Sequence, residues 1–540
     1  MADTKDIVFV NFILDNVHGF IGLTKIEDQI ERLPIFKRLQ DISQLGLVKR
    51  IFPGALHNRY IHSLGVMYVI DQMALHLKEF NSAERQLLRL AGMLHDLGHY
   101  PLSHDLEQVY EIADDALESE MPSVRENLLG ETSKSIQKIT RMVNDLSPED
   151  KEIVDKMQKP KKELVKKGKY HHESITAYAI KHSNSIKAII VDGIQEGYFN
   201  EEDCDWTSGK SEQQIINFAE NIVADICALI QGDGDYVYIE GAFPRRFTAM
   251  MQLLHSELDA DRIDYLLRDA TFSGASYGAF DVGILMQNLK MKEYTIGSKK
   301  AWIVGVREKG IGCADQYMVN RYLAYTQVIF HKYTSIIGKM LREVVLWMMN
   351  LSGTDFYQPD DVLKIIRDQE KNKKYLAFTD SYFFGKLNAI RKEDDGCPDD
   401  IYCFVEQLRK YRALEVECED IFSGNLMHQQ EHIKTSEFYK HIMELEQNGE
   451  ADNEKAIYLF NAKRITNHMP IEQFRKNFDL YNSTHKEKLN YDEFQLDRLM
   501  DGLVVIGDDA PVLLIDAPGS MMREMYDIQQ LMLRKYHFPI

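Results

Sequence analysis

Apolar residues recur every three or four positions through much of the first 350 residues, a spacing typical of helices that bury one face. In the segment 62–80, Leu64, Met67 and Ile70 follow this spacing. The pattern predicts helices over 62–80, 82–99, 252–270 and 315–349, and the last run is long enough to form two helices. We therefore expect the first 350 residues to be mainly helical.

Short strands are expected between these helices and after them. The run DYVYIEG (235–241) is one, and EYTIGSKKAWIVGV (293–306) is typical of a hairpin with its turn at Gly-Ser-Lys-Lys. Later in the chain, charged helical segments lead into three apolar strand-like runs, AIYLFN (456–461), GLVVIGDD (502–509) and PVLLIDAP (511–518). The expected fold class is mainly α, a helical bundle with small β-hairpin elements, plus a mixed α/β C-terminal part.

The charge pattern divides the chain further. Residues 105–169 are acidic at first and then lysine-rich, which is typical of a solvated surface segment. We interpret this segment as a helical insertion. The texture of the sequence changes again near residue 350. We therefore expect a core over 1–350 that carries the insertion at about 105–169, and a C-terminal region over 351–540 that serves regulation or oligomerisation.

Composition limits the classes of partner. The 540 residues include 84 acidic and 64 basic side chains, a formal net charge of −20, which gives no support for a nucleic-acid-binding surface. The chain has no run of about 18 or more apolar residues, as a membrane span requires, and its N-terminus lacks the pattern of a signal peptide. The six cysteines form no Cys-x-x-Cys pair and are typical of reduced thiols. We expect a cytoplasmic protein whose partners are neither membranes nor nucleic acids.

Histidine and aspartate residues gather in four segments, HNRYIHSLG (57–65), HDLGHYPLSH (95–104), YHHESIT (170–176) and LDADRIDYLLRD (258–269). Each segment alone has an ordinary explanation, because a histidine suits the dipole at a helix C-terminus and an acidic helix face is usually solvated. Together they supply the imidazole and carboxylate ligands that suit divalent first-row metals. Asp261, Tyr265 and Asp269 also recur every four residues, so they line one face of a helix.

In this order, the four segments resemble the HD-domain deoxynucleoside triphosphate (dNTP) triphosphohydrolases, which include bacterial dNTPases and the vertebrate SAM-and-HD-domain restriction factor. The resemblance runs from about residue 5 to 345, is weakest over 105–169, and includes no SAM domain. It implies that 1–350 is an HD-domain catalytic core. It also implies a divalent metal, Mn, Mg, Fe or Zn, with His62, His95, Asp96 and Asp261 as ligands.

The same resemblance implies attack on the α-phosphorus of a dNTP, which releases the deoxynucleoside and inorganic triphosphate and lowers dNTP pools, for pool balance or against viruses. The catalytic residues it implies are His104 as proton donor, His172, Glu107 and Glu173 as its supporting relay, and His99 beside the phosphates. The substrate-binding residues it implies are Gln44, Tyr265 and Asp269 at the deoxyribose, and Arg59, Arg262 and Arg321 at the triphosphate.

Some positions depart from the family pattern. Tyr100 is bulkier than usual, and we expect it to narrow the site. Positions 32, 37 and 40 do not match a guanine-selective regulatory pocket, so the identity of a nucleotide activator stays open. A dimer-based homo-oligomer or tetramer is expected. Two alternatives remain: another HD phosphohydrolase acting on nucleoside monophosphates or signalling nucleotides, or a catalytically silent nucleotide-binding regulator.

Overall fold

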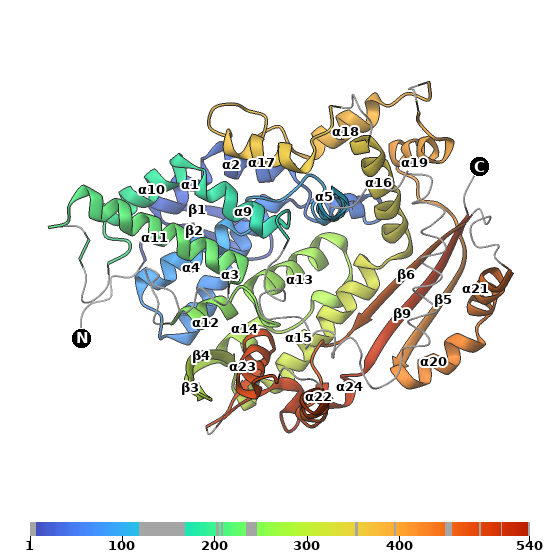
Figure 1. Ribbon diagram of the computed structural model, residues 1–540. Helices are drawn as coiled ribbons and strands as arrows, with labels where there is room; N and C mark the ends of the chain where they lie inside the picture. Colours follow the sequence, from blue (N-terminus) through green and yellow to red (C-terminus); the bar gives the residue numbers. More distant parts are fainter. Residues whose placement is uncertain are drawn as a thin grey trace.

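The computed structural model describes residues 7–117, 168–200, 205–206, 209–233, 246–350, 355–393, 396–448, 456–484, 488–508 and 510–537. The expected strand at 235–241 and most of the expected insertion at 105–169 lie outside these residues. The described chain is mainly helical and carries three small β-sheets, which confirms the expected fold class (Figure 1). Within it, no helix is both long and apolar enough to cross a membrane.

Helices dominate the part before residue 350. They are α1 (Lys25–Glu31), α2 (Pro34–Lys37), α3 (Arg59–Leu77), α4 (Ser82–Leu94), α5 (His104–Leu117), α9 (His172–Lys181), α10 (Asn184–Gln195), α11 (Glu212–Gln231), α12 (Phe247–Gln252), α13 (Ala260–Ser273), α14 (Val282–Gln287), α15 (Ile311–Ala324) and α16 (Lys332–Asn350). The helices predicted over 62–80 and 315–349 are confirmed, the second as α15 and α16 separated by a π-helical turn.

Two predicted helices have different bounds from those expected. The segment 252–270 is not one helix, because α12 ends at Gln252 and α13 begins only at Ala260. The Asp259 side chain accepts a hydrogen bond from the backbone N–H of Arg262 and so caps α13. Helix α4 ends at Leu94, earlier than the predicted end near Gly98. As a result, His95 lies at the end of α4 and Asp261 at the start of α13. Side chains at helix ends can point toward a shared site.

Strands join the two ends of the chain. The sheets are β1 (Asn11–Asp15) with β2 (Gly19–Leu23); β3 (Leu289–Ile296), β4 (Lys299–Val306), β7 (Val504–Ile506) and β8 (Pro511–Leu513); and β5 (Val416–Asn425), β9 (Ile528–His537) and β6 (Ala456–Arg464). The predicted hairpin at 293–306 is β3 and β4, and β7 pairs with β4 in parallel through Val306 and Val505. The helices after residue 350 are α17 (Pro359–Arg367), α18 (Asp380–Ala389), α19 (Asp399–Arg409), α20 (Leu426–Thr435), α21 (Glu437–Asn448), α22 (Ile471–Thr484), α23 (Tyr491–Asp501) and α24 (Met522–Met525).

One apolar core runs through both parts of the chain and includes side chains from Ile21 to Tyr536. Polar contacts link the two parts as well. Arg38 donates to the backbone oxygen of Phe378, and the Ser43 hydroxyl donates to Asp380 at 2.6 Å. Residues after 350 therefore support the segment that leads into α3, where the candidate site begins.

Candidate metal centre

Three helix ends carry the predicted metal ligands. His62 lies in the first turn of α3, whose N-cap Asn58 accepts a hydrogen bond from the backbone N–H of Ile61. His95 is the C-cap residue of α4 and Asp96 follows it, while Asp261 lies in the first turn of α13. The ends of α3, α4 and α13 thus bring together ligands from segments that are far apart in the sequence.

The four side chains converge on one point. His62 Nε2 lies 3.0 Å from Asp261 Oδ1 and 3.8 Å from Asp96 Oδ2. His95 Nε2 lies 3.3 Å from Asp96 Oδ1 and 3.9 Å from Asp261 Oδ1. His62, His95 and Asp96 form a set that could hold a divalent cation, and Asp261 lies beside it as a fourth possible ligand.

The hydrogen bonds of the His62 and His95 rings are those expected of metal-ligating histidines. Both Nε2 atoms are buried and, within the described chain, neither has a well-formed hydrogen bond, although His62 Nε2 lies 3.0 Å from the Asp261 carboxylate. Their other nitrogens are occupied, because His62 Nδ1 lies 2.7 Å from Asp264 Oδ2 and His95 Nδ1 lies 2.8 Å from the backbone oxygen of Gly92. Such outer hydrogen bonds orient metal-ligating histidines and direct the free nitrogen toward the ion.

The charges at this point also favour a cation. Burial alone would raise the pKa of Asp96, but Arg59, His95 and His62 hold it below its ordinary value. The pKa of Asp261 is lowered in the same way, against the effect of burial, chiefly by His62. Burial would lower the pKa of His62, yet Asp261 and Asp264 raise it to about 10. A bound cation would displace that proton, so metal binding should strengthen as pH rises.

A second cluster contains the predicted proton donor. His104 Nδ1 lies 2.6 Å from one carboxylate oxygen of Glu107, and His172 Nδ1 lies 2.7 Å from the other. The His172 ring stacks on His99, with centroids 4.4 Å apart. Glu107 is buried, and the two imidazoles hold its pKa below the ordinary value although burial opposes this. The carboxylate is therefore ionised and orients both rings.

His99 lies between the two clusters. Its Nδ1 accepts a hydrogen bond from the backbone N–H of Tyr100, so in the neutral ring the proton lies on Nε2. This nitrogen is buried and has no hydrogen-bond partner among the described residues. Burial, with Arg59 and His172 nearby, lowers the pKa of His99 well below its ordinary value. His99 thus supplies a neutral N–H donor, a group suited to a phosphate oxygen.

Cationic side chains gather near the start of α13. Arg262 is held by Asp259, and Arg321 Nη1 lies 3.4 Å from Glu257 Oε1. Sequence reasoning missed Lys463 on β6, whose Nζ lies 3.6 Å from the centre of the Tyr325 ring. Burial, together with Arg321 and Arg262, lowers the pKa of Lys463 to about 7. Two arginines, each paired with a carboxylate, and this lysine thus lie close enough to interact, and together they could bind an anion.

The remaining predicted substrate residues lie around these clusters. Gln44 is buried and its Oε1 has no hydrogen-bond partner in the described chain. Asp269 accepts a hydrogen bond from His57 at 2.8 Å, a contact that the sequence did not predict. Tyr265 is on the same helix as Asp261 and Asp269, and burial raises its pKa well above the ordinary value. Gln44, Asp269 and Tyr265 can therefore offer amide, carboxylate and phenol groups to a polar ligand.

Two of the predicted site residues contact other protein side chains that belong to the site. Arg59 donates to Asp96 at 2.7 Å and to the Ser103 hydroxyl at 2.9 Å, so it orients a metal ligand. Glu173 Oε2 lies 3.8 Å from His171 Nδ1, at the edge of the second cluster. The expectation for Tyr100 is wrong, because its ring is fully buried, stacks on Tyr110 and donates to the backbone oxygen of Tyr170.

Gly98 lies between the metal ligands and the His104–Glu107–His172 cluster, where close packing leaves no room for a side chain. A Cβ atom on Gly98 would lie 2.3 Å from the backbone nitrogen of Thr176. The Gly98 N–H donates to the Thr176 hydroxyl, which in turn donates to the backbone oxygen of His95. Gly98 therefore lets α9, which carries His172, approach the metal centre.

Comparison with known proteins agrees with this geometry. Residues 59–268 match the HD domain family, and this range contains all four candidate metal ligands. Residues 59–268 therefore form an HD domain. An HD domain implies a metal-dependent phosphohydrolase, so the residues that converge here are a suitable site for that chemistry.

Relatives of this HD-domain protein are distant over most of the chain. It is 23% identical to Bacillus subtilis "Uncharacterized protein YwfO" over 68% of this chain and 63% of that protein, and 23% identical to Methanocaldococcus jannaschii "Uncharacterized protein MJ1154" over 70% and 57%. It thus spans about 60% of the length of these relatives. A shorter stretch is 42% identical to the deoxynucleoside triphosphate triphosphohydrolase SAMHD1 of Gallus gallus, over 19% of this chain and 18% of that protein.

A solved structure shares the fold. The crystal structure of a hypothetical protein from Aquifex aeolicus has a TM-score of 0.55 and 18% sequence identity, over 98% of this chain and 96% of that one. At this identity the likeness concerns the fold alone.

Proposed function

We propose that this HD-domain protein hydrolyses dNTPs to the deoxynucleoside and inorganic triphosphate. The observation that carries the proposal is the convergence of His62, His95, Asp96 and Asp261, in which each buried Nε2 atom lies within 3.3 Å of a carboxylate oxygen. The adjacent imidazole relay and cationic cluster supply the other groups that this reaction needs. The 42% identity to a dNTP triphosphohydrolase over a short stretch supports the same substrate class.

His62, His95, Asp96 and Asp261 would hold a divalent cation, which would supply polarisation of phosphate oxygens and activation of a water nucleophile. Arg262, Arg321 and Lys463 would bind the triphosphate, since cationic donors match phosphate oxygens in charge and geometry. His99 would donate from Nε2 to a phosphate oxygen near the reacting phosphorus.

The leaving group of this reaction is the 5′-oxygen of the sugar, which is a poor one and needs a proton. His104 is the candidate donor. Its side chain is 59% exposed, so it can reach a bound substrate, and its Nδ1 is held by Glu107. Glu107 also binds His172, and Glu173 lies at the edge of this relay. Glu107 would hold the His104 ring in the orientation needed to donate to the leaving oxygen.

Recognition of the deoxyribose would depend on Gln44, Tyr265 and Asp269. His57 fixes Asp269 at 2.8 Å, which leaves its second carboxylate oxygen for a ligand hydroxyl. Tyr265 keeps its phenol protonated because burial raises its pKa. A bulky ring beside the sugar could exclude a 2′-hydroxyl, and this would select deoxyribonucleotides.

We further propose a cytoplasmic homo-oligomer that lowers dNTP pools and responds to a nucleotide activator, with residues 351–540 contributing to regulation or assembly. An exposed apolar surface supports self-association: Val8, Val10, Phe12, Leu14 and Phe20 gather on and before β1 and β2, and each is more than half exposed.

Identification of the products tests the activity. The protein is incubated with each dNTP, alone and in mixtures, with Mn²⁺ or Mg²⁺, and the phosphorus products are separated. Inorganic triphosphate in equal amount to deoxynucleoside is expected. Pyrophosphate with a nucleoside monophosphate, or orthophosphate without nucleoside, would contradict the proposal. Turnover of nucleoside monophosphates alone would indicate a different HD phosphohydrolase.

A further inference from the structure

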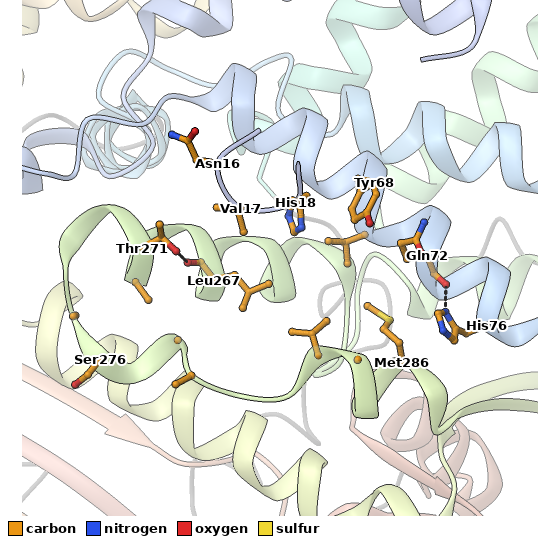
Figure 2. A pocket seen from close by; sticks show the side chains of 17 residues that line it. Asn16, Val17, His18, Tyr68, Gln72, His76, Leu267, Thr271, Ser276 and Met286 are labelled. Carbon is orange, nitrogen blue, oxygen red and sulfur yellow. Dashed lines mark hydrogen bonds between the residues drawn. The ribbon is translucent and has the colours of Figure 1, made fainter. Parts of the chain in front are cut away.

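A cavity of about 790 Å³ lies among the turn between β1 and β2, helix α3, the second half of α13, and α14. Figure 2 shows Tyr68, Gln72 and His76 along α3, Leu267 and Thr271 on α13, and His18 between the two helices. None of the candidate metal ligands, relay residues or substrate residues lines it. The cavity is therefore a separate site.

The chemistry of its wall is unusual for a nucleotide enzyme. The residues that line it, all from the described chain, include no aspartate, glutamate, lysine or arginine. Its polar groups are amides, hydroxyls and imidazoles, from Asn16, Gln72, Thr271, Ser276, His18, His76 and Tyr68, and the rest of the wall is apolar. Phosphate recognition normally uses cationic donors, so this wall does not suit a phosphorylated ligand.

The size and the aromatic groups favour a particular ligand class. Pockets for small organic molecules enclose about 300–1,000 Å³ and combine apolar walls with a few polar groups. The His18 and Tyr68 rings lie 5.0 Å apart and are inclined by 32°, which forms an aromatic corner. A planar, uncharged heteroaromatic molecule could pack against these rings while an amide such as Gln72 binds its polar edge.

One wall residue is linked directly to the metal centre. His18 Nε2 lies 2.6 Å from Asp264 Oδ1, and Asp264 Oδ2 lies 2.7 Å from Nδ1 of the metal ligand His62. Asp264 is fully buried, and a Cβ atom on Gly65 would lie only 2.0 Å from its Oδ1. Because Asp264 is buried and bridges His18 and His62, its carboxylate is a direct path by which a shift of His18 can reach the hydrogen bond that orients His62.

The turn that holds His18 is itself fixed by hydrogen bonds. Asp15 Oδ1 accepts from the backbone N–H groups of Val17 and His18, at 2.9 and 2.7 Å. The other Asp15 oxygen accepts from Arg268, which also donates to Asp264. The wall of the cavity and the support of His62 thus form one hydrogen-bonded unit.

We propose that this cavity binds an uncharged heteroaromatic molecule of about nucleoside size, and that its occupancy alters metal affinity through His18 and Asp264. His18 is then a positioning residue that never touches the substrate. The coupling rests on the metal centre of the proposed function, whereas binding in the cavity does not.

Indole and deoxyadenosine are suitable probes for the binding site, with saturation-transfer NMR and thermal shift as readouts on the full chain. We expect both probes to bind the wild-type protein. Ala275→Phe, which places a ring in the cavity, should weaken binding at least tenfold. Ile284→Phe is the matched control, because Ile284 is exposed on α14 and does not line the cavity. Equal binding to both variants, or no binding to the wild type, would overturn the proposal. So would displacement of indole by dAMP as effective as that by deoxyadenosine.

Coupling is measured without substrate, from the loss of the free Mn²⁺ electron paramagnetic resonance signal. Saturating indole, which is not a product of the proposed reaction, should change the Kd of Mn²⁺ about fivefold or more, and Mn²⁺ should change the Kd of indole by the same factor. In His18→Gln the probe should still bind while the two affinities become independent. Unchanged Mn²⁺ affinity in the wild type would overturn the coupling and leave the proposed function intact. Absence of Mn²⁺ binding would instead contradict the proposed function, while probe binding would still stand.

Discussion

Glu107 is the residue on which the imidazole relay depends, because its two oxygens hold His104 and His172 separately. Glu107→Gln keeps the shape but removes the negative charge and one acceptor. We expect kcat for dNTP hydrolysis to fall about 100-fold or more, the range of general acid–base effects. The Kd of Mn²⁺ should stay unchanged, since Glu107 is not one of the four ligands. Steady-state kinetics and Mn²⁺ titration check these two values.

Glu212→Gln is the control for this change, because Glu212 is an exposed residue in the first turn of α11. Its kcat should equal that of the wild type. A Glu107→Gln enzyme with normal kcat would remove the relay from the mechanism.

Lys463 gives the anion site a pH dependence. Its pKa is lowered to about 7 by burial and by Arg321 and Arg262, so the side chain loses its charge as pH rises through 7. Binding of inorganic tripolyphosphate in metal-free buffer should therefore weaken from pH 7 to 9. Lys463→Arg stays charged over this range. The variant should bind on the order of tenfold more tightly than wild type at pH 9, with little difference at pH 6.

Calorimetric titration at the two pH values measures this difference. Comparison of the two proteins at each pH cancels the ionisation of the tripolyphosphate itself. Parallel pH profiles for wild type and Lys463→Arg would show that Lys463 does not contact the anion.

At the scale of elements, the β1–β2 hairpin presents an apolar face to solvent. Leu14 and Phe20 are cross-strand partners and are 67% and 70% exposed. Exposed apolar patches on a folded protein commonly mark interfaces. The double variant Leu14→Ser/Phe20→Ser should shift the chain to a smaller assembly at equal concentration, as measured by light scattering. Leu480→Ser, at a 54% exposed leucine on α22, should leave the mass unchanged.

The same scale explains why the segments of the site could be recognised in the sequence while one helix boundary could not. The ligand segments 57–65, 95–104 and 258–269 are recognisable because each chemical group lies within a few residues of a helix end. The break between α12 and α13 was missed, because the apolar pattern of 252–270 continues through the cap at Asp259. Periodicity reports which residues are buried, and a cap changes the backbone without changing that pattern.

At the scale of the whole molecule, a substitution at Gly305 tests how much the packing between the parts of the chain before and after residue 350 contributes to stability. A Cβ atom there would lie 2.2 Å from the backbone oxygen of Val504, at the junction of β4 and β7. Gly305→Ala should lower the free energy of unfolding by about 1–3 kcal/mol, as overpacking does. Gly312→Ala on α15 meets nothing within 4 Å and should not destabilise the chain. Urea unfolding of both variants measures the difference, and equal stabilities would mean that the junction contributes little.

The sequence by itself determined the mainly helical fold and the predicted hairpin, because these features depend on local spacing, which the order of residues contains directly. The side chains proposed as metal ligands came from the family resemblance of four short segments, and the structure brings these side chains together. Only the tertiary structure decided that Lys463 approaches Arg321, that Asp264 orients His62, and that a cavity without charged residues lies beside His18. Such contacts join distant segments through packing, and no local pattern in the sequence encodes the distance between them.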